Sequence, residues 1–156
     1  MSPPRFSRIT VAIDGSPNSE DALDAAIDLV ARAQGELTIV AVAPLVPVYL
    51  PSASPYVSAP VQRGETKQYQ ALVDAAVKRA HDSGANAATG VCLEGVVVDE
   101  ILSFVERNPC DMIVVGSRGL SATKRLVIGS ISSALVTHAP CPVLVVRGRP
   151  STKPAG

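Results

Sequence analysis

The sequence has little of what recognises nucleic acid or crosses a membrane. Its 156 residues include no Trp, three Tyr and two Phe, and the formal net charge is zero. Few aromatic rings leave little surface on which bases could stack, and zero net charge gives no field to attract a polyanion. No apolar run reaches the length that spans a bilayer. We therefore expect neither a nucleic-acid partner nor a membrane partner.

Cysteine and secretion signals are also scarce. The three cysteines, Cys92, Cys110 and Cys141, form neither a Cys-x-x-Cys pair nor a zinc-ligand pattern. They are expected to be buried free thiols in a reducing compartment. Asp14 interrupts the first apolar run, so the N-terminus lacks the apolar segment of a signal peptide. These features together predict a cytoplasmic protein.

Continuous apolar runs alternate with helical patterns along the chain. Strands are expected at 9–13, 37–43, 88–93, 112–115 and 143–146, and helices at 17–34, 64–83, 98–106 and 130–138. Strands without polar alternation are typical of parallel sheets that helices cover on both faces. The pattern predicts one α/β domain over residues 1–147 with a largely parallel sheet, followed by a disordered tail over 148–156.

Glycine and proline mark the expected boundaries. Gly35 and Gly84 are expected to end the first two helices. Five prolines between Pro44 and Pro60 exclude a regular helix or a central strand there. The role of that segment does not follow from its composition.

A glycine-rich segment follows the fourth expected strand. Gly116-Ser-Arg-Gly119 is separated by nine residues from Gly129-Ser130, where the last helical pattern begins. Glycine permits positive φ and close approach of a ligand, and a helix N-terminus offers unpaired N–H groups with partial positive charge. This arrangement predicts a phosphate-binding site. The alternative is that the glycines only shape turns.

Other functional motifs are missing. Neither Gly-x-Gly-x-x-Gly after the first strand nor Gly-x-x-x-x-Gly-Lys-Ser/Thr occurs. No acidic pair or metal-ligand cluster lies beside the glycines, so we predict no catalytic and no metal-binding residue. His81 and His138 lie near expected helix C-termini, where a cation interacts favourably with the helix dipole.

Three segments resemble the universal stress protein family. They are Val11-Ala-Ile-Asp14-Gly-Ser, Cys110-Asp-Met-Ile-Val-Val-Gly-Ser-Arg-Gly119 and Cys141-Pro-Val-Leu-Val-Val146, and the glycine spacing resembles the Gly-2x-Gly-9x-Gly-Ser/Thr signature of the family's ATP-binding branch. The resemblance extends from about Phe6 to Arg147. It implies an open five-stranded parallel sheet in the order 3-2-1-4-5, a Rossmann-like fold of the adenine nucleotide alpha-hydrolase type.

The resemblance also implies the residues of a nucleotide site. Asp14 would bind the ribose hydroxyls, the backbone of Val42 would meet the adenine edge, and Ala12 and Val115 would line the base pocket. The phosphates would be surrounded by Gly116, Gly119, Gly129, Ser130 and Ile131, with Arg118 offsetting their charge. The alternatives are a turn or cap role for Asp14 and plain core packing for the apolar residues.

ATP is therefore the expected ligand, with any Mg²⁺ carried on its phosphates. An apolar Val96-Val97-Val98 run leaves a smaller adenine nucleotide open as the alternative ligand. The implied function is an ATP-binding regulatory or stress-response protein and not an efficient enzyme. The rivals are a slow ATP hydrolase, an autophosphorylating enzyme with Ser130 or Ser132 as acceptor, and a nucleotide-free interaction module. Family members pair the final strand across a two-fold axis, which implies a homodimer.

Overall fold

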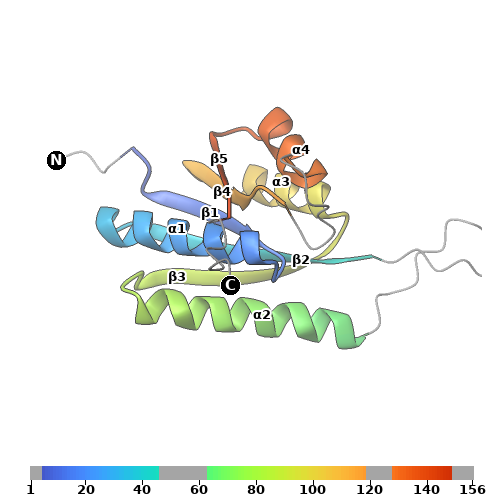
Figure 1. Cartoon of the computed structure of the whole chain (residues 1–156), viewed down its shortest axis with the longest axis horizontal. Helices are drawn as coiled ribbons and strands as arrows, with labels where there is room; N and C mark the ends of the chain where they lie inside the picture. The colour runs from blue at the N-terminus through green and yellow to red at the C-terminus, as the bar shows by residue number, and fades with distance from the viewer. Residues whose placement is uncertain (1–4, 46–62, 119–127, 149–156) are drawn as a thin grey trace, which may run out of the picture.

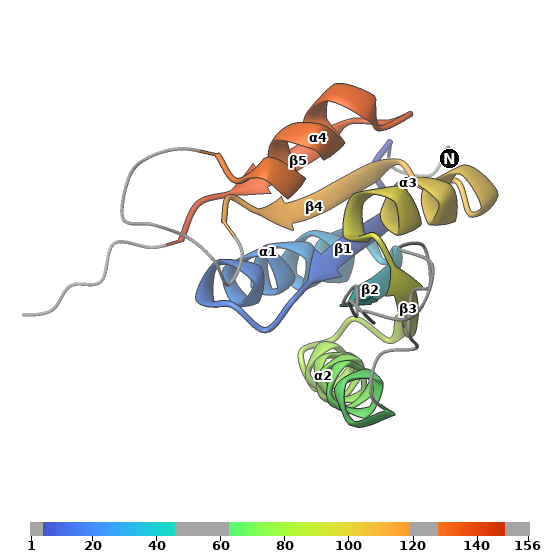
Figure 2. The same cartoon turned by 90° about the vertical axis from the view of Figure 1, so that its right-hand side faces the viewer.

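A five-stranded parallel sheet lies at the centre of the structure, with helices on both faces (Figure 1, Figure 2). This computed structural model describes residues 5–45, 63–118 and 128–148. The elements in chain order are β1 (Arg8–Ile13), α1 (Pro17–Ala33), β2 (Glu36–Pro44), α2 (Arg63–Asp82), β3 (Ala87–Gly95), α3 (Val97–Arg107), β4 (Met112–Gly116), α4 (Ser130–His138) and β5 (Val143–Val146).

The strand order is β3-β2-β1-β4-β5, as predicted. The chain builds outward from β1 through β2 to β3, then crosses back to β4 on the other side of β1 and continues to β5. Such a reversal leaves a space outside the carboxyl ends of the two central strands, where ligands of open α/β sheets bind. The fold therefore directs attention to the ends of β1 and β4.

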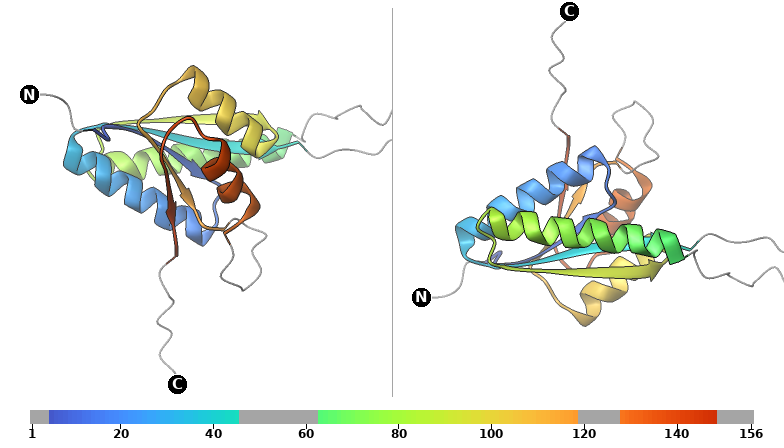
Figure 3. Two further views of the ribbon diagram at one scale, coloured as in Figure 1. Left: turned by 90° about the horizontal axis from the view of Figure 1, so that it is seen from above. Right: turned by 90° about the horizontal axis from the view of Figure 1, so that it is seen from below.

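Side chains of each strand alternate between two hydrophobic cores, because successive residues of a strand point to opposite faces. Val11 and Ile13 enter the first core, against α1 and α2, whereas Ala12 enters the second, against α3 and α4. Figure 3 shows the two helix pairs on opposite sides of the sheet. Arg79 of α2 also contacts the carboxylates of Glu20 and Asp24 on α1.

Helix α1 begins as predicted but ends differently. The Ser16 hydroxyl accepts a hydrogen bond from the Ser19 N–H at 3.3 Å, and Pro17 is the first helical residue. The expected stop at Gly35 is wrong, because Gln34 takes the left-handed conformation, with φ of 51°. Gly35 instead allows close packing, since a Cβ there would lie 2.1 Å from the Ser7 carbonyl oxygen.

The remaining boundaries agree with expectation to within two residues. Gly84 follows α2 with φ of 92°, as a helix-ending glycine should. β2 and β3 are longer than predicted because they pair from Glu36–Ala87 through to Pro44–Gly95. Most of the proline-rich segment and the tail from residue 149 lie outside the described residues, so the expectations for them stay predictions.

The cysteines are free thiols, as predicted, but each is half-buried and not buried. In the part of the chain that the structure describes, no helix is both long and apolar enough to cross a membrane.

Candidate functional site

The predicted site residues gather at one edge of the sheet because parallel strands bring their carboxyl ends together. Ala12 of β1 pairs with Val115 of β4, so Asp14 and Ser117 follow neighbouring strands. Ile13 pairs with Ala41 as the last β1–β2 register pair, which brings Asp14 level with Val42. Residues that are far apart in sequence thus meet around the end of β1.

Three of the predicted residues are core residues in this structure. Ala12, Val42 and Val115 are 8%, 5% and 6% exposed and belong to the second core, on the α3 and α4 face. Their packing agrees with the simpler interpretation of these positions. A contact with an adenine base stays a prediction, although all three lie on one face beside the ends of β1 and β4.

Asp14 forms the turn between β1 and α1. Its Oδ1 accepts a hydrogen bond from the Ser16 N–H at 2.9 Å, and its own N–H donates to the Ser19 hydroxyl at 3.3 Å. The side chain is half-buried. A carboxylate has two oxygens with about four acceptor positions, so this bond leaves capacity for a ribose hydroxyl. The turn role is observed, and the ribose role stays a prediction.

Gly116 is required by packing between elements. A Cβ there would lie 2.7 Å from the carbonyl oxygen of Asn18, in the first turn of α1. Neither Gly116 nor Gly129 has positive φ, so the expected conformational reason for these glycines is wrong. Backbone conformation does not test whether these glycines contact a nucleotide, so that role stays a prediction.

Two hydrogen bonds join the start of α4 to the end of β4, and a third closes the first turn of the helix itself. The Gly129 N–H donates to the Ser117 carbonyl at 2.7 Å, and the Ser133 N–H donates to the Gly129 carbonyl at 3.0 Å. The buried Ser132 hydroxyl donates to the Gly116 carbonyl at 2.6 Å. The helix N-terminus is therefore held beside the strand end.

That N-terminus carries no side-chain cap and no acidic residue. Gly129 occupies the N-cap position, and the first turn has neither an Asp nor a Glu. An α-helix leaves its first N–H groups without intrahelical partners, and its dipole makes that end positive. A fixed, uncapped N-terminus of this kind suits an anion such as phosphate.

The other predicted phosphate residues have different environments. Ser130 is exposed, Ile131 is half-buried against the second core, and Arg118 is half-buried. Gly119 lies outside the described residues, as do the nearby cations Lys124 and Arg125. Among the described residues, no group of three or more His, Cys, Asp or Glu side chains could hold a metal ion.

Asn18 is a site neighbour that sequence reasoning missed. Its backbone carbonyl faces Gly116, and its Oδ1 accepts a hydrogen bond from the Gly148 N–H at 3.0 Å. Asn18 thus joins α1 to the end of β4 and to the chain that leaves β5. Asn18 is far from Gly116 and Gly148 in the sequence, and no local sequence pattern indicates contacts between residues so far apart.

The sequence and the fold both match proteins of one known family. The model of the universal stress protein family matches residues 5–147. Universal stress protein YxiE of Bacillus subtilis is 34% identical over 148 residues, which cover 91% of this chain and 99% of that protein. A universal stress protein solved in complex with cAMP is 25% identical, with a TM-score of 0.68 and coverage of 92% of this chain and 98% of that one.

A third protein shows the same fold at lower identity. The universal stress protein from Archaeoglobus fulgidus in complex with dAMP has a TM-score of 0.67 and 19% identity, covering 92% of this chain and 99% of that one. At that identity the likeness concerns the fold alone.

Proposed function

The chain belongs to the universal stress protein family, and we propose that it binds an adenine nucleotide, ATP, and acts as a nucleotide-dependent regulatory protein in a stress response. The binding site proposed is the carboxyl edge of β1 and β4. The N-terminus of α4 would hold phosphate through Gly129, Ser130 and Ile131. Asp14 would hold the ribose, and Ala12, Val42 and Val115 would form the base side.

One observation carries the proposal: the N-terminus of α4 is uncapped, free of acid and fixed beside the end of β4. Elsewhere in the structure, α1 satisfies its own N-terminus through Ser16. The N–H groups at the start of α4 have no side-chain cap of this kind. Because Asp14 follows the strand that adjoins β4, its carboxylate lies at the same edge as a helix N-terminus that would suit an anion. A nucleoside phosphate presents hydroxyls and an anion together.

We propose that the adenine nucleotide is ATP. A related protein was solved in complex with cAMP, which supports an adenine nucleotide here. The spacing Gly116, Gly119, Gly129 favours ATP, with Mg²⁺ carried on the phosphates. The phosphates would supply the charge, and the residues of this chain would bind and orient them.

An autophosphorylating enzyme would need a phosphate acceptor, and of the two candidate serines one is already engaged in the fold. Ser132 is 2% exposed and donates its hydroxyl to the Gly116 carbonyl. Ser130 is exposed and is the acceptor that an autophosphorylating protein would use. Counting phosphate released per bound ATP separates a regulatory protein from a hydrolase.

The test of the proposal is direct measurement of binding. Mass spectrometry of gently purified protein identifies any retained nucleotide, and calorimetry compares ATP, ADP, AMP and cAMP. We expect ATP to bind most tightly. Failure of all four nucleotides to bind would leave the nucleotide-free interaction module as the function. Tighter binding of AMP or cAMP would keep the site but correct the ligand.

Two further parts of the proposal concern the whole protein. A homodimer built around β5 is supported by the edge position of that strand and by Leu144, which is 36% exposed. A cytoplasmic location is supported by three free thiols, which persist in reducing compartments.

A further inference from the structure

Two cysteines lie side by side at the amino edge of the sheet, opposite the proposed nucleotide site. Cys110 stands between α3 and β4, and Cys141 stands between α4 and β5. Because β4 and β5 are neighbouring parallel strands, the segments that lead into them run next to each other. The two Sγ atoms are 3.8 Å apart, although the residues are 31 positions apart in sequence.

The backbone holds this pair in place. Pro109 precedes Cys110, and Pro140 and Pro142 flank Cys141. Proline fixes its own φ and restricts the residue before it, so both connections are stiff. The Pro142 carbonyl also accepts a hydrogen bond from the Ile113 N–H at 2.9 Å, which ties the two connections together. The contact between the thiols is therefore built into the fold.

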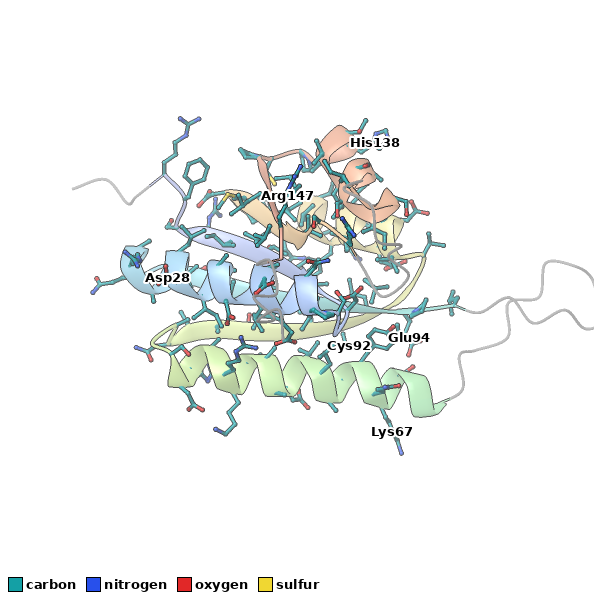
Figure 4. The ribbon with its side chains drawn as sticks, viewed as in Figure 1. Asp28, Lys67, Cys92, Glu94, His138 and Arg147 are labelled. Carbon is teal, nitrogen blue, oxygen red and sulfur yellow. The ribbon has the colours of Figure 1, made fainter. Side chains whose placement is uncertain are left out.

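The third cysteine is on the other side of the molecule. Cys110 and Cys141 pack at the border of the second core, whereas Cys92 packs against the first core. Figure 4 shows Cys92 on β3, beside α2. Cys110 and Cys141 are half-buried, so a small oxidant can reach them. Cys92 has a comparable exposure and no thiol neighbour in its cluster, which makes it an internal control.

We propose that Cys110 and Cys141 are a redox-active dithiol, a modification site that a hydroperoxide such as hydrogen peroxide converts into an intramolecular disulfide. Cys110 Sγ attacks the peroxide, the O–O bond breaks, and a sulfenic acid and one water form. Cys141 Sγ then attacks the sulfenic sulfur, the S–S bond forms, and the hydroxyl leaves with the Cys141 proton as a second water. The dithiol loses two electrons and two protons, and the peroxide gains them.

The local chemistry favours this order of steps. Burial and the adjacent Cys110 thiol raise the pKa of Cys141 to about 11. A raised pKa leaves less thiolate on Cys141, so the proposal assigns the first attack to Cys110. Closing the gap from 3.8 Å to a disulfide of about 2.05 Å requires the two Sγ atoms to approach by about 1.8 Å.

The bond would form a covalent ring from Cys110 to Cys141. The ring contains β4, the glycine-rich segment and α4, and so it encloses the elements that carry the proposed phosphate site. Cross-linking restricts the unfolded chain, so the oxidised protein should resist denaturant better than the reduced one. The proposal is independent of nucleotide binding, because the two thiols lie at the opposite edge of the sheet.

The experiment treats the reduced, full-length protein at low micromolar concentration with stoichiometric hydrogen peroxide, followed by alkylation and mass spectrometry. Before alkylation, the oxidised wild type and an oxidised Cys92→Ser variant should each be about 2 Da lighter than their reduced forms, the mass of two hydrogens. Peptide mapping should find Cys110 joined to Cys141 in both. A Cys110→Ser variant should form no intramolecular bond, and dithiothreitol should restore the wild-type mass and lower its urea midpoint.

Several results would overturn the proposal. Among them are a bond that includes Cys92, a bond between two chains, and conversion of Cys110 to a sulfinic acid without any bond. If Cys110→Ser fails to fold, the peptide map of the Cys92→Ser protein decides the question alone. Thiols that only fill space in the core would leave both cysteines reduced, or oxidised separately.

Discussion

Asp14 is the residue at which a structural role and a proposed binding role are hardest to separate. Its Oδ1 holds the turn through the Ser16 N–H. If the carboxylate also binds the ribose, Asp14→Ala should weaken ATP and ADP alike, because both carry that sugar. The loss of a hydrogen bond to a charged group is worth about 1.5–3 kcal/mol, so calorimetry should record at least a tenfold weaker affinity.

Asp14→Asn is the matched control for this prediction. An amide oxygen can still accept the Ser16 N–H and keep the turn, but it lacks the charge and the second carboxylate oxygen. A loss of affinity confined to ATP would point to a phosphate or metal role. Unchanged affinity for both nucleotides would leave Asp14 with its turn alone.

Asp111 offers a prediction about stability and pH at the other edge of the sheet. Its carboxylate accepts hydrogen bonds from the Arg8 N–H at 2.8 Å and the Ser7 N–H at 3.1 Å, and it pairs with the Arg8 guanidinium. The pKa of Asp111 is lowered, mainly by the hydrogen bond from the Arg8 N–H. The Arg8 side chain and the Ser7 N–H lower it further. A carboxylate with a lowered folded-state pKa stabilises the fold above its unfolded value, about 3.9, and that contribution is lost as pH falls through the folded value.

Asp111→Asn should therefore reduce the free energy of unfolding by about 1 kcal/mol at neutral pH. It should also flatten the decrease in that free energy during acidification below about pH 4. Urea titrations at a series of pH values measure both effects. Asp28→Asn is the control, because the Asp28–Arg32 pair on α1 is exposed and should change stability by less than about 0.5 kcal/mol. Parallel pH curves for wild type and Asp111→Asn would contradict the prediction.

The glycines show why single residues were harder to interpret from sequence than the elements around them. The sequence predicts a helix stop at Gly35 and a ligand approach at Gly116. The structure shows that each glycine makes room for a distant backbone carbonyl, that of Ser7 or Asn18, and the ligand approach at Gly116 stays a prediction. A sequence pattern shows that a side chain is missing, but it cannot show which remote atom occupies the space.

Elements are predictable where local and long-range requirements coincide. The bounds of α4 and β5 were predicted to the residue, since the prolines Pro140 and Pro142 separate a helical pattern from a continuous apolar run. β3 was predicted too short, because its length is set by pairing with β2 and not by its own composition. The gathering of Asp14 and Gly116 at one edge followed from parallel topology, but their hydrogen bonds did not.

The N-terminus of α4 permits a test that separates binding from folding. Asp is a favoured N-cap residue, and the φ of −62° and ψ of 160° at Gly129 are typical of that position. A carboxylate there would satisfy the N–H groups of the helix itself and repel a phosphate. Gly129→Asp should therefore keep or raise thermal stability while weakening ATP at least tenfold in calorimetry, which is about 1.4 kcal/mol.

Gly129→Asn is the matched control, since it caps the helix without a negative charge. Both variants place a Cβ 3.3 Å from the Ser117 carbonyl oxygen, so any packing cost is shared. Full ATP affinity in a folded Gly129→Asp protein would remove α4 from the proposed site.

At the scale of the whole molecule, β5 is an edge strand among the strands that the structure describes. This strand pairs with β4 on one side, and Val143 and Val145 pack into the second core, while Leu144 is 36% exposed on the other face. An apolar edge strand is a liability unless another strand covers it. A second copy of the chain related by a two-fold axis would provide that cover, because closed two-fold dimers are the commonest soluble oligomers.

Replacing Leu144 with Lys should therefore shift sedimentation toward monomer across micromolar concentrations, because a charged edge residue opposes strand pairing. Leu29→Lys is the control, since Leu29 is 38% exposed but belongs to α1 and not to the edge strand. If the Leu144→Lys variant unfolds while the Leu29→Lys variant stays folded, assembly and folding are inseparable. A wild-type chain that sediments as a monomer throughout would refute the dimer. Nucleotide binding would survive that result, because Asp14 and Gly129 belong to the same chain.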